Sequence, residues 1–253
     1  MEIKNAAAVY FSPGGTTGLA ARTVAAALGE CKEYDFTSRA EPVTLGADCA
    51  AVFAAPVFGG RIPGVFADFL ASVKGEGTPA VVLAVYGNRD YEDALLELAD
   101  AVKARGFRVV AAGAFIARHS IVTEIAAGRP DAADKAAMAA FAGKVRDKLA
   151  AGDFSEPHIP GARPYRKYGG VPMHPGANRQ RCVKCGKCAR ECPAGAIPAD
   201  APFKTDNDKC ITCMHCVFTC PNYARGLNPV MLAATRTKLK KACAARREPE
   251  MFL

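Results

Sequence analysis

The chain has 253 residues and a formal net charge of +8; 50% of its residues are hydrophobic and 23% are charged, an ordinary composition for a folded globular protein. This length allows two domains. No apolar run approaches the ~18 residues that a membrane-spanning helix needs, and the first residues lack the pattern of a signal peptide, so we expect no transmembrane segment.

The positive charge lies in the second half of the chain. Residues 1–150 contain 16 Lys and Arg against 17 Asp and Glu, whereas residues 151–253 contain 17 against 8. A basic segment can indicate nucleic-acid binding. No DNA- or RNA-recognition motif accompanies it, however, and cysteines of the same half would offset part of the charge if they held metal as thiolates. We therefore expect no nucleic-acid partner.

The first predicted element is a buried strand at residues 6–11, where Ala-Ala-Ala-Val-Tyr-Phe forms a continuous apolar run. It leads into a loop rich in Gly and Thr, and then into an Ala-rich helix that ends near Leu28. The first N–H groups of a helix lack partners and lie at its positive end, so such a loop predicts an anion site. The residues predicted to form this site are Ser12, Gly14, Gly15, Thr16 and Thr17.

Two other nucleotide-binding motifs fit this loop less well. A Walker A loop is excluded because no Gly-Lys-Ser/Thr follows. A dinucleotide fingerprint is only loosely mimicked by Gly14, Gly15 and Gly18, because its G-x-G spacing is not met. The several hydroxyl groups suit a terminal phosphate better than a pyrophosphate.

Further strands and helices follow in alternation. The strands are predicted at residues 33–36, 49–55, 80–86 and 108–115, and the later helices end near residues 73, 105 and 150. This alternation is typical of an α/β protein with a doubly wound, five-stranded parallel sheet. Ligands of such sheets bind at the carboxyl ends of the strands, where all the Gly-containing loops fall.

Residues 1–150 resemble a flavodoxin, through Ser12, Gly15 and Thr17 of the first loop; Gly14 stands where that family usually has threonine. The resemblance implies a flavodoxin-like domain that binds FMN, with the phosphate on the first loop and the isoalloxazine ring between two later loops. It also implies that Tyr91 stacks on the ring. The residues that it assigns to the later loops are Pro56, Val57, Phe58, Gly59, Gly60, Tyr86, Gly87, Asn88 and Tyr91.

Three further residues of this domain are predicted to lie near the flavin. Arg61 and Arg89 would flank it, and an arginine near the ring would attract the anionic reduced form. His119 follows the fifth strand at the same edge and could reach flavin or substrate. For each of the three, a purely structural or solvated position remains the alternative.

Residues 151–178 form the next predicted region, a Pro- and Gly-rich linker. Five prolines fall in this stretch, which argues for an extended connector along the surface. We expect it to hold the following domain beside the flavin edge.

Eight of the eleven cysteines lie between residues 182 and 220, in two copies of the spacing C-x2-C-x2-C-x3-C-P. Three closely spaced thiolates can hold three corners of an iron–sulfur cubane, and the fourth cysteine of each copy is placed to ligate the other cluster. The first [4Fe–4S] cluster is predicted on Cys182, Cys185, Cys188 and Cys220. The second is predicted on Cys210, Cys213, Cys216 and Cys192.

Two other uses of these cysteines fit less well. A structural zinc site takes four ligands in two pairs, and a disulfide framework belongs to small secreted domains. The complete motif resembles the bacterial two-cluster ferredoxins over residues 179–228, which implies a small α+β domain with two clusters. Metal-binding thiols must stay reduced, so we expect a cytoplasmic protein, and exposed clusters suggest an oxygen-poor cell.

Residues 229–253 are predicted to form a basic helix through about Arg247. Leu232, Leu239 and Cys243 recur on one stripe, and lysines and arginines cover much of the rest. The helix would pack on its own protein through this stripe. Alternatively, its basic face could dock to an acidic electron partner or lie on a membrane surface.

The chain as a whole resembles a flavodoxin–ferredoxin fusion. The resemblance implies an electron-transfer protein that passes electrons between two [4Fe–4S] clusters and FMN and exchanges them with a protein redox partner. Two alternatives remain: an FMN-dependent reductase of a small organic acceptor fed by the clusters, and a redox sensor with a protein partner. The sequence leaves a homodimer open.

Overall fold

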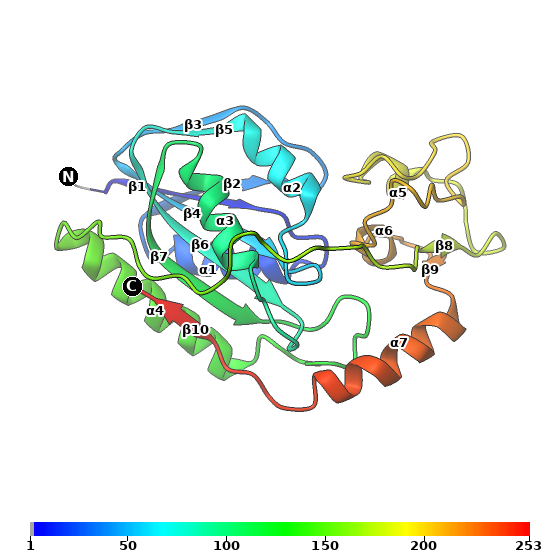
Figure 1. Ribbon diagram of the computed structural model, residues 1–253. Helices are drawn as coiled ribbons and strands as arrows, with labels where there is room; N and C mark the ends of the chain where they lie inside the picture. Colours follow the sequence, from blue (N-terminus) through cyan, green and yellow to red (C-terminus); the bar gives the residue numbers. More distant parts are fainter. Residues whose placement is uncertain (1–2) are drawn as a thin grey trace.

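A computed structural model describes residues 3–253 and shows a mixed α/β domain with a small cysteine-rich module at one edge (Figure 1). Six strands form the main sheet, in the order β10-β7-β6-β4-β1-β2. Five of these strands, β7, β6, β4, β1 and β2, are parallel to one another, and β10 is antiparallel to β7. Their bounds are β1 (Asn5–Tyr10), β2 (Glu30–Asp35), β4 (Cys49–Pro56), β6 (Thr78–Tyr86), β7 (Phe107–Ile116) and β10 (Glu250–Phe252).

Helices cover both faces of this sheet. Helices α1 (Thr16–Ala25) and α4 (Ala132–Ala150) pack on one face, and α2 (Gly64–Phe69) and α3 (Ala94–Lys103) pack on the other. Strands β4 and β6 are buried almost throughout because both of their faces lie under helices, which explains why they read as continuous apolar runs. A short 3-10 helix (Leu70–Ser72) and a two-stranded sheet of β3 (Val43–Leu45) and β5 (Val73–Gly75) complete this side.

The predicted parallel strands are all present, with shifted ends. Strand β2 begins at Glu30, three residues before the expected start, because its backbone pairs with β1 along its whole length although most of its side chains are exposed. A prediction from apolar residues alone therefore makes this edge strand too short. Within residues 3–253, no helix is both long enough and apolar enough to cross a membrane.

The C-terminal region differs from the prediction. Helix α7 (Pro229–Ala242) ends five residues before Arg247. The Asn88 amide donates hydrogen bonds to the carbonyl oxygens of Cys243 (3.0 Å) and Ala245 (2.9 Å), and its oxygen accepts one from the backbone N–H of Arg247. These bonds hold the backbone in an extended path, so residues 243–249 return to the sheet and β10 adds a sixth strand beside β7 (Figure 1).

The connector between domain and module runs without helix or strand from residue 153 to residue 175. The two carboxylate oxygens of Asp93 accept the backbone N–H groups of Ala162 and Arg166, at 2.9 and 2.7 Å. Asp100 on α3 binds the guanidinium of Arg163 and the hydroxyl of Tyr165. The connector is therefore fixed to the start and middle of α3, as a tether along the surface.

The cysteine-rich module lies at the carboxyl-end edge of the parallel strands (Figure 1). Its regular elements are α5 (Lys187–Arg190), α6 (His215–Phe218) and a two-stranded antiparallel sheet of β8 (Gly176–Ala177) and β9 (Arg225–Gly226). The imidazole Nδ1 of His215 lies 3.1 Å from the carbonyl oxygen of Pro13, so α6 contacts the loop that follows β1.

Candidate functional site

The loop after β1 opens directly into α1, as predicted. Gly15 adopts a left-handed conformation (φ 85°), and its N–H donates to the carbonyl oxygen of Ser12. The Ser12 hydroxyl accepts the backbone N–H of Gly18 at 2.8 Å, so this hydroxyl is engaged in the turn itself. Of the five residues predicted to form an anion site, Gly14, Thr16 and Thr17 line a cavity, and Ser12 and Gly15 support the turn.

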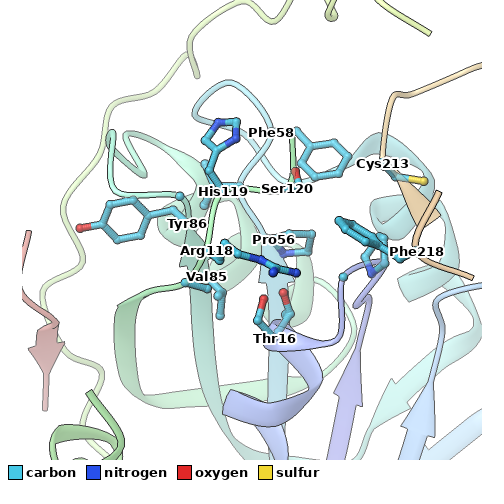
Figure 2. A pocket seen from close by; sticks show the side chains of 16 residues that line it. Thr16, Pro56, Phe58, Val85, Tyr86, Arg118, His119, Ser120, Cys213 and Phe218 are labelled. Atoms are coloured by element: carbon cyan, nitrogen blue, oxygen red, sulfur yellow. The ribbon is translucent and has the colours of Figure 1, made fainter. Parts of the chain in front are cut away.

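That cavity, of about 80 Å³, lies at the carboxyl ends of β1, β4, β6 and β7 (Figure 2). None of the described residues that line it carries a carboxylate, whereas Arg118 contributes a guanidinium. Figure 2 shows the Arg118 side chain extending from the end of β7 over the space above Thr16. Hydroxyls, a helix start and one cation suit a bound anion.

A second cavity of about 500 Å³ adjoins the first. The two share the lining residues Val57, Phe58, Tyr86, Gly87, His119 and Ser120. The outer walls of the second cavity come from the connector, the cysteine-rich module and α7, for example Tyr168, Ile211 and Leu239. Its surface is mainly apolar, with Arg89, Asp90 and Lys238 among the lining residues. A cavity lined by hydroxyl groups and one guanidinium thus continues into a wide, mainly apolar chamber.

The loops predicted to surround a ring contribute unequally to these cavities. Pro56, Val57, Phe58, Tyr86 and Gly87 line the first cavity, and Gly59 lines the second. Gly60, Asn88 and Tyr91 line neither. The space beside the Gly60 Cα is instead occupied by other side chains, because a Cβ there would lie 1.7 Å from a carboxylate oxygen of Glu92.

The structure places the side chains of Tyr91 and Asn88 outside both cavities. The Tyr91 ring is 7% exposed and packs on Tyr86 with 5.6 Å between ring centroids, and its hydroxyl donates to Glu250 at 2.8 Å. Burial, together with that carboxylate, raises the pKa of Tyr91 well above its usual value. Asn88, in a left-handed conformation (φ 63°), holds the C-terminal backbone. Both side chains anchor the returning chain rather than facing the cavity.

For Arg61, the structure favours the structural alternative. Its guanidinium forms two hydrogen bonds with Glu97, at 2.7 and 2.6 Å, donates to the carbonyl of Arg166 and stacks on Tyr165. It secures the connector to α3 and lines neither cavity. Arg89, by contrast, pairs with Glu92 and lines the second cavity.

His119 lies where the sequence placed it and lines both cavities. Its Nδ1 accepts the backbone N–H groups of Ile121 and Val122, both at 3.1 Å, so the proton of the neutral ring is on Nε2. Burial, and then the nearby Arg89 charge, lower the pKa of His119 to about 4. Near pH 7 this side chain is therefore a neutral hydrogen-bond donor at the junction of the two cavities.

Several lining residues were not predicted. Arg118 follows β7 directly, so the rule that ligands bind at strand ends could have identified it. Cys213 and Phe218 come from the cysteine-rich module, and Tyr168 comes from the connector. No local signal marks these three for the cavity, because they reach it through contacts between distant segments.

The eight motif cysteines line two further small cavities, each of about 20 Å³. One is lined by Cys182, Cys185, Cys188 and Cys220, and the other by Cys192, Cys210, Cys213 and Cys216. Each set combines three cysteines of one motif copy with the last cysteine of the other copy. Backbone N–H groups already donate to two of the sulfurs, from Ala196 to Cys192 (3.3 Å) and from Ala224 to Cys220 (3.2 Å).

The donor set in these cavities fits an iron–sulfur cubane. In each cavity four cysteine side chains surround a space of about 20 Å³, and four thiolates are the ligand set of a [4Fe–4S] cubane. Burial raises the pKa of Cys213 to about 12 and that of Cys216 to about 11. Buried thiols of this kind lose their protons when a metal compensates the thiolate charge.

Arg225 lies between the two cysteine sets. Its guanidinium is buried and donates to the carbonyl oxygens of Pro202 and Pro175, both at 2.7 Å, and to the Thr205 hydroxyl. One of its nitrogens lies 3.9 Å from the sulfur of Cys188, and its positive charge also lowers the pKa of Cys216 against the effect of burial. In the described chain, Arg225 Nε has no hydrogen-bond partner.

Comparisons with known proteins identify the cysteine-rich module. Residues 174–221 match the family model of the 4Fe-4S dicluster domain. A component of the ion-translocating oxidoreductase complex of Methanosarcina acetivorans is 46% identical over 44 residues, which are 17% of this chain and 17% of that protein. The pyruvate synthase subunit PorD of Methanocaldococcus jannaschii is 43% identical over 51 residues, which are 19% of this chain and 59% of that protein.

These matches cover less than two thirds of either relative and do not extend to the α/β domain. No solved structure matches the chain. The family model does not reach residues 3–153, so for that domain we argue from its geometry. For residues 174–221 the comparisons give an assignment: this chain carries a 4Fe-4S dicluster domain of the ferredoxin type.

Proposed function

We propose that this protein transfers electrons between two [4Fe–4S] clusters and FMN. Each cluster would be held by one of the two cysteine sets that line the small cavities, with Cys182, Cys185, Cys188 and Cys220 for the first and Cys192, Cys210, Cys213 and Cys216 for the second. The relatives matched by the module are subunits of redox complexes, which supports a protein redox partner. We place the protein in the cytoplasm, where thiols stay reduced.

The strand order supports a flavodoxin-like FMN domain. Counted along the chain, the parallel strands are arranged 2-1-3-4-5, and sheets of this order bind ligands at the switch point between the first and third strands. Here those strands are β1 and β4, and the anion-suited cavity lies at their carboxyl ends, between Thr16 and Pro56. The phosphate would bind at Gly14, Thr16 and Thr17, and the ring would occupy the chamber between Phe58 and Tyr86.

The chain's own residues prepare this chamber. FMN, when bound, accepts one or two electrons, so it can link one-electron transfer to two-electron transfer. Arg118 supplies positive charge beside the anion end, and Nε2 of His119 offers a neutral donor at the junction of the cavities. Phe58 and the connector residue Tyr168 line the chamber and would offer aromatic contact to a bound ring.

One observation carries the proposal: Cys213 lines both the second cysteine cavity and the cavity after β1. Among the described residues, no cysteine of the first set lines the latter cavity. Phe218, from α6 of the same module, covers Gly14, since a Cβ on that glycine would lie 3.4 Å from its ring. In this proposal the second cluster, which Cys213 would ligate, is therefore the one that would adjoin the flavin.

The test is to count cofactors per chain in protein purified without oxygen. We expect about eight irons, about eight sulfides and one acid-released FMN, on the basis of two cubanes and one flavin site. Eight irons without flavin, even after incubation with FMN, would overturn the flavin assignment and leave a two-cluster protein. About four irons would overturn the two-cluster assignment.

The size of the second cavity favours one further candidate function, an FMN-dependent reductase of a small organic molecule. A mainly apolar chamber of about 500 Å³ is within the range of ligand pockets. Loaded protein would then oxidise its flavin faster in the presence of such a molecule, and His119→Gln would slow this step without loss of FMN. If no acceptor from an apolar small-molecule panel speeds flavin oxidation, the protein is a carrier.

A further inference from the structure

The surface around the first cysteine cavity is open to solvent, unlike that around the second. Cys185 is exposed, and the neighbouring Val183 is 63% exposed. Tyr223, which follows the last cysteine of the same set, is 80% exposed. The second set includes the buried Cys213 and lies toward the α/β domain. The two cluster sites therefore differ in access: one faces this protein, and the other faces solvent.

The exposed residues around Cys185 belong to one continuous surface. The guanidinium of Arg190 donates to the Cys185 carbonyl at 2.9 Å, and the Asn222 amide donates to the carbonyl of Arg181 at 3.4 Å. Val183 and Lys184 line the first cysteine cavity together with Asn222. One face thus combines two exposed apolar side chains, one exposed cysteine and several cations. We call it the Cys185 face and define it by Arg181, Val183, Lys184, Cys185, Arg190 and Tyr223.

The charged residues of this face are all positive. Residues 179–190 contain five Lys and Arg and no Asp or Glu, and no acidic residue occurs from 157 to 190. Within the described chain, none of these five cations forms an ion pair. Elsewhere, guanidiniums such as those of Arg61 and Arg163 are paired with carboxylates. Cations without carboxylate partners around an apolar centre are typical of a surface that meets an acidic partner.

We propose that the Cys185 face binds an acidic one-electron carrier protein, such as a small acidic ferredoxin. The inference rests on the electron-transfer function proposed above. In the complex, the carrier's reduced cluster loses one electron and returns to its oxidised form, and the first cluster of this chain gains that electron; the reverse transfer uses the same contact. Basic residues speed such encounters, and the exposed Val183 and Tyr223 supply apolar contact at the centre.

The basic face of α7 is the competing surface. Lys240 and Lys241 are exposed there, but the packed side of α7 lies against Ile121 and Ala126. None of the described residues of α7 lines either cysteine cavity. A carrier docked on α7 would therefore meet protein rather than a cluster site. This contrast provides a matched control, because two exposed cations can be reversed in charge on each surface.

The experiment measures binding of an oxidised acidic two-cluster ferredoxin to the loaded protein at low and moderate salt. The variant Arg181→Glu/Lys184→Glu changes the net charge by the same amount as the control Lys240→Glu/Lys241→Glu. We expect the first to weaken binding about tenfold or more and to flatten the salt dependence, and the control to change binding by less than about twofold. Iron content and absorption spectrum should match those of the unmodified protein.

Electron transfer gives the second readout. Reduced ferredoxin should reduce the Arg181→Glu/Lys184→Glu variant more slowly by a similar factor, whereas a photoreduced neutral deazaflavin should reduce both variants equally. Equal weakening of binding by the two variants would show an effect of net charge alone and overturn the docking site, as would undiminished binding by the first variant or no binding to the unmodified protein. The cofactor count is independent, so it shows separately whether the electron-transfer function fails.

Discussion

The imidazole Nδ1 of His215 lies 3.1 Å from the carbonyl oxygen of Pro13, although 202 positions separate the two residues. A carbonyl oxygen only accepts, so the ring donates its Nδ1–H. Nε2 of the same ring lies 3.4 Å from a carboxylate oxygen of Glu191. His215 therefore joins the cysteine-rich module to the loop after β1, which is the loop proposed to bind the FMN phosphate.

Removing this contact should slow the electron transfer between module and flavin. His215→Ala loses a bond worth about 0.5–1.5 kcal/mol, so we expect the module to shift relative to the loop without unfolding. The flavin of the loaded variant should then be reduced more slowly after rapid reduction of the clusters, as followed by stopped-flow absorption. The exposed His158→Ala is the control. An unchanged rate would mean that the contact does not set the approach of the two sites.

Cys213 should be needed for the second cluster alone. Cys213→Ser removes one of the four thiols of that cavity, and serine ligates iron poorly compared with a thiolate. We expect the iron content to fall by about half from the ~8 of two cubanes. Cys31→Ser, outside both cavities, should retain all of the iron. Full iron content in Cys213→Ser would contradict the assignment of this ligand.

Arg225 should hold the reduction potentials of the clusters high. A positive charge beside the sulfurs stabilises the more negative, reduced cluster. Replacing it by methionine removes this charge, and a tenfold loss in the preference for the reduced cluster would lower the potential by about 59 mV for one electron. Redox titration followed by electron paramagnetic resonance measures the shift.

The control for Arg225→Met is the exposed Arg179→Met, which stacks on Phe203 and lines neither cysteine cavity. Arg225→Lys should restore part of the potential because it keeps the charge. A potential that does not move in Arg225→Met, with iron content intact, would show that the residue serves only to pack the module.

Asn88 should stabilise the C-terminal return to the sheet. Asn88→Ala loses three hydrogen bonds to the backbone of residues 243–247 and leaves buried carbonyl groups without partners. We expect a loss of about 2–3 kcal/mol in the free energy of unfolding, measured by urea titration. Asn222→Ala, with one exposed bond, should lose less than about 0.5 kcal/mol. Equal losses would mean that the bonds of Asn88 add no more to stability than the single exposed bond of Asn222.

His119 should make the stability depend on pH. Its pKa in the folded protein is about 4, below the 6.5 of the free side chain, so the unfolded chain binds the proton more readily. The stability from the neutral ring is fully present above pH 6.5 and falls as the pH decreases toward 4. His119→Gln should lack this component, so the difference in melting temperature from the unmodified protein should shrink across that interval. A constant difference would contradict the buried, neutral state.

The sequence by itself determined the features that depend on neighbours along the chain. Tight spacing brings Cys182, Cys185 and Cys188 to one cavity, and the loop after β1 opens α1 because Gly15 permits the left-handed turn. Apolar runs marked the interior strands β4 and β6, since a strand covered on both faces must be apolar on both. The class of fold and the two cysteine sets follow from such local rules.

Only the tertiary structure decided which side chains face the cavities. Tyr91 is turned toward Glu250 and Asn88 toward Cys243, across 159 and 155 positions of sequence. A polar side chain of a loop takes the partner that the folded chain brings to it, and a local pattern does not specify that partner. The same holds for Cys213: its motif marks it as a cluster ligand, but its place beside the cavity after β1 depends on how the connector fixes the module to the sheet edge.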